Sequence, residues 1–142
     1  MIEIEELRQI VTAEFVVFHA TFCASLVVEY PNKDTVDIEN QEEDFISLAF
    51  VKPKVLSNSI MGADGFTQTS PELWVYYFTK RGKGESASCR FADDLIKHFL
   101  YQRFEQGLEC NEIQSNPVEF YKDWKTDLYR LRFRSTGFNT IC

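Results

Sequence analysis

The chain has 142 residues, of which 44% are hydrophobic and 26% charged, and its formal net charge is −7 at pH 7. This length predicts one globular domain with a single core, and the acidic balance argues against a simple nucleic-acid binder. No apolar run reaches the length of a membrane span. The N-terminus is acidic, unlike a signal peptide, and the four cysteines are widely spaced, so we expect a cytosolic protein with reduced thiols.

Residues 2–18 predict an amphipathic helix. Its apolar residues recur at intervals of three or four, and acidic residues occupy the first turns, where the helix dipole favours them. The apolar positions are Ile4, Leu7, Val11, Phe15 and Phe18. The pattern changes to alternation over residues 26–30, which predicts a strand that stops at Pro31.

An acidic segment and a second strand follow. Residues 33–44 carry six carboxylates and the single Lys33, without the glycine and acid spacing of a calcium-binding EF-hand loop. Residues 45–51 are apolar and predict a strand. Residues 52–70 are rich in small polar residues, glycine and proline, and predict a mobile loop of a length that is often functional.

The middle of the chain predicts a strand, a turn and a helix. Residues 73–78 are an unbroken run of aromatic, β-branched and aliphatic residues, typical of a central strand that is covered on both faces. The turn at 80–84 is basic and contains two glycines. In the helix that follows, Ser86 is a candidate N-cap and Gly107 the glycine that ends it. Its buried stripe is predicted at Phe91, Leu95 and Phe99.

The C-terminal part predicts two strands. Residues 108–114 favour a short strand, and Asn116-Pro117 predicts a turn. After Trp124, the last strand has the clearest alternation in the chain. One face should carry Tyr129, Leu131 and Phe133, and the other Arg130, Arg132 and Arg134.

These elements predict an α+β domain. Most connections between strands are short enough for antiparallel pairing, so we expect a single antiparallel sheet of four to five strands with two helices packed on one face. The whole chain, 1–142, forms one domain in this interpretation. A mobile loop is predicted near 52–70 and a frayed tail near 136–142.

No pattern of reactive side chains predicts an enzyme or a cofactor site. His19 and Cys23 are four residues apart, but a catalytic pair also needs an orienting group and an oxyanion site, so we expect ordinary packing. The glycine turn lacks the spacing of a phosphate loop, and Glu85 would repel a phosphate. Two histidines and four scattered cysteines give no zinc spacing. We therefore expect no catalytic residue, no cofactor and no metal.

The order of elements and several short motifs occur together in one known family. The motifs are Val28-Glu-Tyr-Pro-Asn32, Phe45-Ile-Ser-Leu-Ala-Phe-Val51, Leu73-Trp-Val-Tyr-Tyr-Phe78 before a Gly-x-Gly turn, Ala-Asp-Asp-Leu in the second helix, and Tyr129-Arg-Leu-Arg-Phe133 in the last strand. Over most of residues 2–135 the chain resembles the tail-terminator (tail-completion) proteins of long-tailed phages and prophages. The acidic stretch after Asn32 departs from the family pattern.

The resemblance implies a structural protein of the virion without catalysis. Such proteins are small α+β domains that assemble in the host cytoplasm as rings, generally hexameric, on the end of the tail tube. The ring stops tube growth and forms the surface that meets the head connector. The implied partners are other copies of the chain, the tail-tube protein and the head connector or head-completion protein, with no membrane and no specific nucleic-acid binding.

Two other interpretations stay open. The chain could be another phage connector component or a bacterial protein-interaction adaptor module without catalysis. It could also be a small enzyme whose site is hidden among its aromatic residues, in which case a deep pocket with convergent polar groups should be present.

The charges suggest where copies of the chain would meet. Residues 1–71 hold twelve acids and four bases, whereas residues 72–142 hold ten acids and eleven bases. We hypothesise a head-to-tail contact between an acidic loop and an arginine face, which can close a ring if its rotation allows. The residues would be Glu42, Glu43 and Asp44 of one copy and Arg130, Arg132 and Arg134 of the next. Exposed pairs of this kind set orientation rather than drive assembly.

Overall fold

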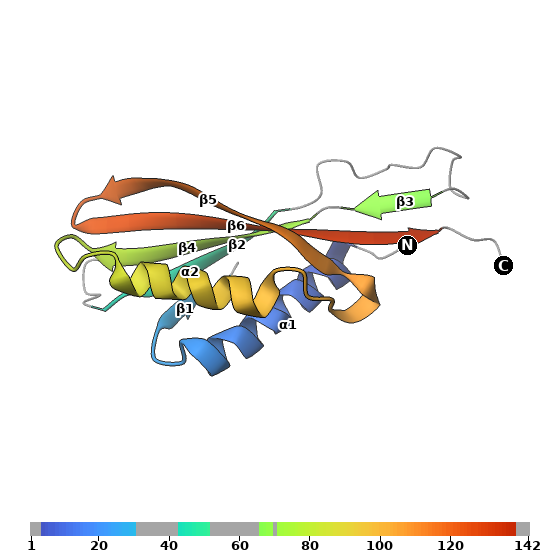
Figure 1. Cartoon of the computed structure of the whole chain (residues 1–142), viewed down its shortest axis with the longest axis horizontal. Helices are drawn as coiled ribbons and strands as arrows, with labels where there is room; N and C mark the ends of the chain where they lie inside the picture. Colours follow the sequence, from blue (N-terminus) through green and yellow to red (C-terminus); the bar gives the residue numbers. More distant parts are fainter. Residues whose placement is uncertain (1–3, 31–42, 52–65, 70, 139–142) are drawn as a thin grey trace.

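The computed structural model describes residues 4–30, 43–51, 66–69 and 71–138 (Figure 1). Within these residues the chain forms two helices, six strands and a short 3₁₀ turn. They are α1 (Ile4–Phe22), β1 (Val27–Glu29), β2 (Phe45–Val51), β3 (Phe66–Thr69), β4 (Glu72–Lys80), α2 (Ser86–Phe99), η2 (Glu105–Gly107), β5 (Glu109–Tyr121) and β6 (Trp124–Phe138). The predicted α+β class is confirmed.

The sheet is built around β6. β3 and β4 follow one another along one edge of β6, because Thr69 is paired with Ser135 and Glu72 with Arg132 in the same antiparallel register. β5 is paired antiparallel along the other edge. β2 is antiparallel to β4, and β1 lies beyond β2. Within the described residues the sheet therefore has six strands, rather than the four to five predicted.

The first two strands run parallel, so the prediction of a wholly antiparallel sheet is wrong. Val27 is paired with Phe45, and Glu29 with Ser47, in the same direction. Parallel neighbours need a connection of about a dozen residues or more, and residues 30–44 supply that length. Alternation of apolar residues does not distinguish the two directions, which explains the error.

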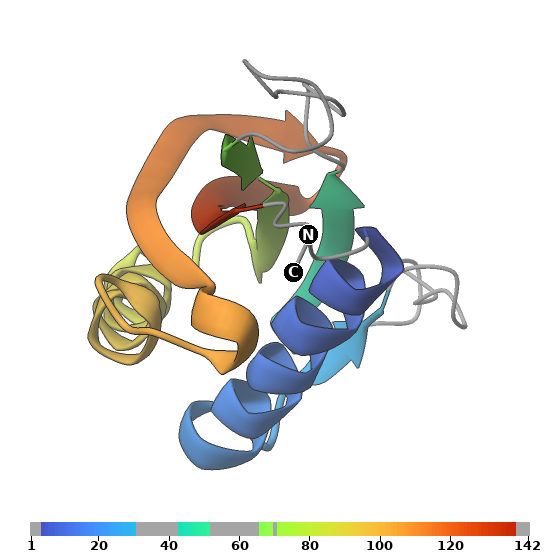
Figure 2. The same cartoon turned by 90° about the vertical axis from the view of Figure 1, so that its right-hand side faces the viewer.

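Both helices pack against the same face of the sheet, and Figure 2 shows the sheet curving around them. On this face the alternate residues of β4 and β6 are buried, as the strand pattern predicts. The apolar residues of the two helices pack against these strand residues in one core. Within it, Phe15 and Phe18 of α1 contact the ring of Phe99 in α2. The predicted stripe of α2, Phe91, Leu95 and Phe99, is buried, and so are Leu73 and Val75 in the strand predicted to be central.

α2 ends at Phe99, eight residues before the predicted Gly107. The chain turns at Tyr101, whose φ is +61°, and the amide of Tyr101 donates a hydrogen bond of 2.7 Å to the carbonyl of Cys110. Gly107 has the left-handed conformation expected of a terminal glycine, with φ of +72°, but it closes η2 instead of α2. Hydrogen bonding to the backbone of β5 thus ends α2 at a position where the sequence has no terminal glycine.

β5 runs through Asn116-Pro117, where a turn was predicted. The register of β5 on β6 shifts between Asn116 and Glu119, which marks a bulge. Among the described strands β5 lies at an edge, and a proline at a bulge of an edge strand leaves the ladder intact. The chain turns later, in a two-residue hairpin of Lys122 and Asp123, where Lys122 has φ of +52°.

Two regions predicted to be flexible contain strands. Within 52–70, residues Phe66–Thr69 form β3, and residues 52–65 and 70 lie outside the described residues. Within the tail predicted to fray near 136–142, residues 136–138 are the end of β6, and 139–142 lie outside the described residues. β3 and the end of β6 form a two-stranded ribbon that extends past the helices (Figure 1).

Candidate interaction surfaces

The side of the sheet away from α1 and α2 is the first candidate surface, and we call it the open face. No described helix lies on this side (Figure 1). In the two central strands, Trp74, Tyr76, Phe78, Thr126 and Leu128 are half-buried on this face, whereas Glu72 and Trp124 are buried. The central strand, predicted to be covered on both faces, is therefore only partly covered on this one by the described part of the chain.

A cavity of about 320 Å³ lies on the open face. It is lined by Trp74, Tyr76, Asn116, Glu119, Thr126 and Leu128. Burial raises the pKa of Tyr76, and the nearby Glu119 carboxylate raises it further, so the phenol remains a hydrogen-bond donor at neutral pH. Two aromatic rings beside an aliphatic side chain and a few polar groups form a surface suited to another protein's side chains.

Arg130 is held on the open face by its own chain. Its Nη2 lies 3.2 Å from Oε1 of Glu72, and its guanidinium group lies over the ring of Trp74 at 5.0 Å. Trp74 Nε1 donates to the same Glu72 oxygen at 3.4 Å. Glu72 is only 4% exposed, and these partners offset the cost of burying its carboxylate.

The other two arginines of the predicted stripe share this face and are more exposed. Arg132 Nη1 lies 3.5 Å from Oε2 of Glu112, with both side chains 38% exposed. Arg134 is exposed. The alternation that was predicted for the last strand is confirmed, because Tyr129, Leu131 and Phe133 are buried on the opposite side. Acids of the neighbouring strands reduce the repulsion between the like charges.

Two of the predicted acidic partners, Glu43 and Asp44, lie at the other end of the sheet in the same chain. Glu42 lies outside the described residues. Glu43 is exposed, and its Oε2 is 4.0 Å from Nζ of Lys83. Asp44 Oδ2 accepts a hydrogen bond of 2.7 Å from the hydroxyl of Tyr77. Burial raises the pKa of Tyr77, and the hydrogen bond to Asp44 raises it further. Within one chain, then, Glu43 and Asp44 are not brought to the arginine stripe.

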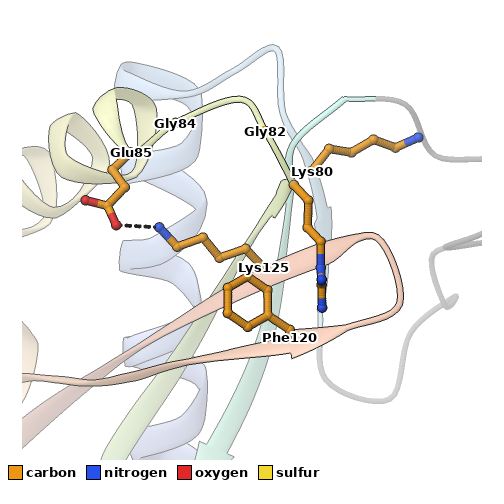
Figure 3. Close-up of a pocket in the computed structure, with 7 residues that line it drawn as sticks. Lys80, Gly82, Gly84, Glu85, Phe120 and Lys125 are labelled. Atoms are coloured by element: carbon orange, nitrogen blue, oxygen red, sulfur yellow. Dashed lines mark hydrogen bonds and ion pairs between the residues drawn. The ribbon is translucent and has the colours of Figure 1, made fainter.

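The second candidate surface lies where the β4–α2 turn meets the β5–β6 hairpin, and we call it the basic pocket (Figure 3). Its cavity measures about 550 Å³. The lining residues are Lys80, Arg81, Gly82, Gly84, Glu85, Phe120 and Lys125. Two segments that are about forty residues apart in the sequence therefore build one surface.

Local structure positions the side chains of the basic pocket. Glu85, and not the predicted Ser86, occupies the N-cap position of α2 and makes no capping hydrogen bond. Instead Lys125 Nζ donates to Oε1 of Glu85 at 2.8 Å (Figure 3), which lowers the pKa of the Glu85 carboxyl. The guanidinium group of Arg81 lies 4.4 Å from the centre of the Phe120 ring, and Phe120 is 58% exposed. The pocket thus combines surplus positive charge with an exposed aromatic ring.

A buried polar cluster joins α2 to β6. Ser88 Oγ donates to Oδ2 of Asp127 at 2.5 Å and lies 2.8 Å from the hydroxyl of Tyr129. Burial raises the pKa of Tyr129. A serine is activated as a nucleophile by an adjacent general base such as histidine, whereas Ser88 contacts a carboxylate and a phenol. Because these hydrogen bonds join α2 to β6, they hold the helix in register on the sheet.

His19 and Cys23 do not contact one another as a reactive pair. His19 Nε2 lies 2.7 Å from the carbonyl oxygen of Leu26, and burial raises the pKa of Cys23 to about 11. Among the described residues, no group of three His, Cys, Asp or Glu side chains is placed to hold a metal ion. In the same part of the chain no helix combines the length and apolarity that crossing a membrane requires.

The basic pocket was not predicted from the sequence. The interpretation of Asn116-Pro117 as a turn left Phe120 in no element, so its position opposite Arg81 was not apparent. Residues 119–121 and 124–126 contain aromatic and β-branched residues on either side of Lys122-Asp123, but this pair is not one of the glycine-containing pairs that signal a two-residue hairpin. No clear local signal in the sequence therefore places Phe120 at the hairpin tip.

Comparison with known proteins supports the fold. No family model and no curated protein matches the sequence. A solved protein structure whose title names no activity superimposes with a TM-score of 0.66 at 14% sequence identity, covering 92% of this chain and 96% of that chain. At this identity the likeness concerns the fold alone. Because nearly all of both chains is covered, the arrangement of two helices on a curved sheet is shared as a whole domain.

Proposed function

We propose that this chain is a structural assembly protein of a long-tailed phage or prophage, which caps the tail tube as a ring and joins it to the head connector. The open face is the observation that carries the proposal. It presents half-buried aromatic side chains on a sheet whose other face is fixed by the core. A preorganised apolar and polar surface of this kind binds another protein with little ordering cost.

The proposed role requires binding and no catalysis. The candidate reactive groups are used structurally: Ser88 and Tyr129 hold α2 on the sheet, and His19 binds a backbone carbonyl. The partners would be other copies of the chain, the tail-tube protein and the head connector or head-completion protein. The protein would assemble in the host cytoplasm and remain at the neck end of the tail in the virion.

Negative-stain microscopy of the purified protein mixed with terminator-free tail tubes tests the proposal. We expect ring-shaped density on one end of each tube. Tyr76→Ala removes an aromatic ring from the open-face cavity and should reduce the fraction of capped tubes, with circular dichroism showing that the fold is kept. Asp93→Ala, on the exposed side of α2, is the matched control and should cap as the wild type does. A folded wild-type protein that leaves every tube uncapped would contradict the proposal and favour an adaptor that binds other partners.

A further inference from the structure

A groove with acidic walls lies between α1 and η2. Its volume is about 300 Å³, and it is lined by Glu6, Gln9, Ile10, Ala13, Glu14 and Glu105. Ile10 and Ala13 give it an apolar floor. Glu14 Oε2 lies 3.6 Å from Nε2 of His98, whereas Glu6 and Glu105 make no ion pair with any residue that the structure describes. We call this surface the acidic groove.

The acidic groove and the basic pocket lie apart along the longest axis of the molecule. In Figure 1 the β4–α2 turn and the β5–β6 hairpin are at the left end of the longest axis, and η2 and the start of α1 are toward the right. One chain therefore carries a positive surface at one end and, separated from it along the same axis, a negative surface on α1 and η2. Such a polar arrangement allows every copy to contact two others in the same way.

The two surfaces are complementary in chemistry as well as in sign. The basic pocket offers the planar guanidinium group of Arg81 against the exposed ring of Phe120. No ion pair joins Arg81 to a described residue, so its five N–H donors have no carboxylate among those residues. Arginine binds carboxylates with two parallel hydrogen bonds and retains its contact with an aromatic face. The acidic groove supplies carboxylates beside the apolar residues Ile10 and Ala13.

We propose that copies of this chain associate end to end, with the basic pocket of one copy on the acidic groove of the next. The inference rests on the proposed function only for its biological role, because it names the surface through which a ring would form. The arginine stripe is a weaker choice for this contact, since Arg130 and Arg132 already have acidic partners in their own chain. Repetition of the end-to-end contact closes a ring if the rotation between copies allows it.

Sedimentation-velocity ultracentrifugation of charge-reversal variants tests this contact. Arg81→Glu makes the basic pocket less positive, and Glu105→Lys makes the acidic groove less negative. Each variant alone should weaken self-association about tenfold or more, because like charges then face each other. The two variants mixed in equal amounts should associate again, because each supplies the surface that the other has lost. The double variant Arg81→Glu/Glu105→Lys should also recover self-association.

Matched controls separate this contact from a general effect of charge. Arg90→Glu and Asp93→Lys make the same charge changes at exposed positions of α2 outside both surfaces, and they should associate as the wild type does. Phe120→Ser should weaken association without a change in charge. A wild type that stays monomeric at low ionic strength, or single variants that associate normally, would overturn the inference. Recovery in the mixture excludes misfolding as the cause of the single-variant losses.

The same variants distinguish failure of the contact from failure of the proposed function. If the wild type caps tail tubes and Arg81→Glu caps them equally well, the proposed function stands and the end-to-end contact is wrong. If self-association follows the charge pattern above but no tube is capped, the contact stands and the assignment to the tail is wrong. Loss of capping by each single variant, with recovery in the double variant, supports both.

Discussion

Leu95 is completely buried where α2 meets the sheet, whereas its neighbour Ile96 is 45% exposed. Leu95→Ala should lower the free energy of unfolding by about 2–5 kcal/mol, because it leaves a cavity in a close-packed core. Ile96→Ala is the matched control and should cost less than about 1 kcal/mol. Urea denaturation measures both changes. Similar losses from the two variants would mean that the two residues do not differ in burial as described.

The cysteines differ in environment, and this difference predicts their reactivity. Burial raises the pKa of Cys23 to about 11 and that of Cys110 to about 12, so both remain protonated at pH 8. Cys89 is exposed. Because the thiolate is the reactive species, brief alkylation of the native protein at pH 8 should modify Cys89 first.

Peptide mapping by mass spectrometry measures the extent of modification at each cysteine. Alkylation of the unfolded protein in urea is the control, and there the thiols of Cys23, Cys89 and Cys110 should react at similar rates. Modification of Cys110 as fast as Cys89 in the native protein would show that the interior beside β5 is open to solvent.

At the scale of elements, backbone conformation rather than packing controls two turns. Gly84 has φ of +82°, and a Cβ added there would meet nothing within 4 Å. Tyr101 has φ of +61° although it is not a glycine, and its side chain is 70% exposed. Left-handed backbone is unfavourable for residues with a Cβ by about 1–2 kcal/mol. The two positions therefore predict opposite effects of opposite substitutions.

Gly84→Ala should lower the free energy of unfolding by about 1–2 kcal/mol, and Tyr101→Gly should raise it by up to about 1 kcal/mol. Thermal and urea denaturation measure both variants. A stabilising Gly84→Ala would contradict the positive φ of the β4–α2 turn. A destabilising Tyr101→Gly would show that the Tyr101 side chain makes a contact worth more than the relief of strain.

The elements that repeat a clear pattern were predictable, and those decided by distant contacts were not. The phase of α2 and of β6 follows from residues at helical or alternating spacing, and burial confirms both. The end of α2 depends on the bond from Tyr101 to Cys110 in β5, which no local pattern contains. The direction of β1 depends on a partner strand whose paired residues are eighteen positions away.

In the candidate surfaces, too, the features set by local pattern were predictable and those set by distant contacts were not. The arginine side of β6 was predictable because alternation alone assigns its face. Its partner Glu72, on β4, was not, because register between strands is set by the assembled sheet. The basic pocket needs the hairpin at Lys122-Asp123, and this pair is not one of the glycine-containing pairs that signal a two-residue hairpin. The basic pocket was therefore not predictable from the local sequence pattern.

For the whole molecule, the arginine stripe still predicts an effect on assembly. Arg132→Glu should leave the monomer folded, because Arg132 is 38% exposed and exposed ion pairs contribute only about 0–1 kcal/mol. The stripe hypothesis predicts weaker oligomerisation or tail capping, with partial recovery when Glu42 and Glu43 are also reversed. Ultracentrifugation and tube-capping assays at low and physiological salt measure the effect.

A second reversal shows where the partner of Arg132 lies. Recovery on Glu112→Arg in the same chain would assign the effect to the intrachain pair described here. Recovery only on reversal of Glu42 and Glu43 would assign it to a contact between copies. Normal assembly and capping by Arg132→Glu at both salt concentrations would leave the stripe as solvated surface and strengthen the case for contact through the two ends of the molecule.

The position of β6 has a consequence for synthesis. β3, β4 and β5 all precede β6 in the chain, and all three pair with it. Until residues 124–138 have left the ribosome, β4 has one open edge and β3 and β5 lack the partner they have in the finished sheet. Open strand edges with apolar side chains pair readily with other chains. The sheet is therefore completed only after β6 has been synthesised, and until then the open strand edges are available for pairing with other chains.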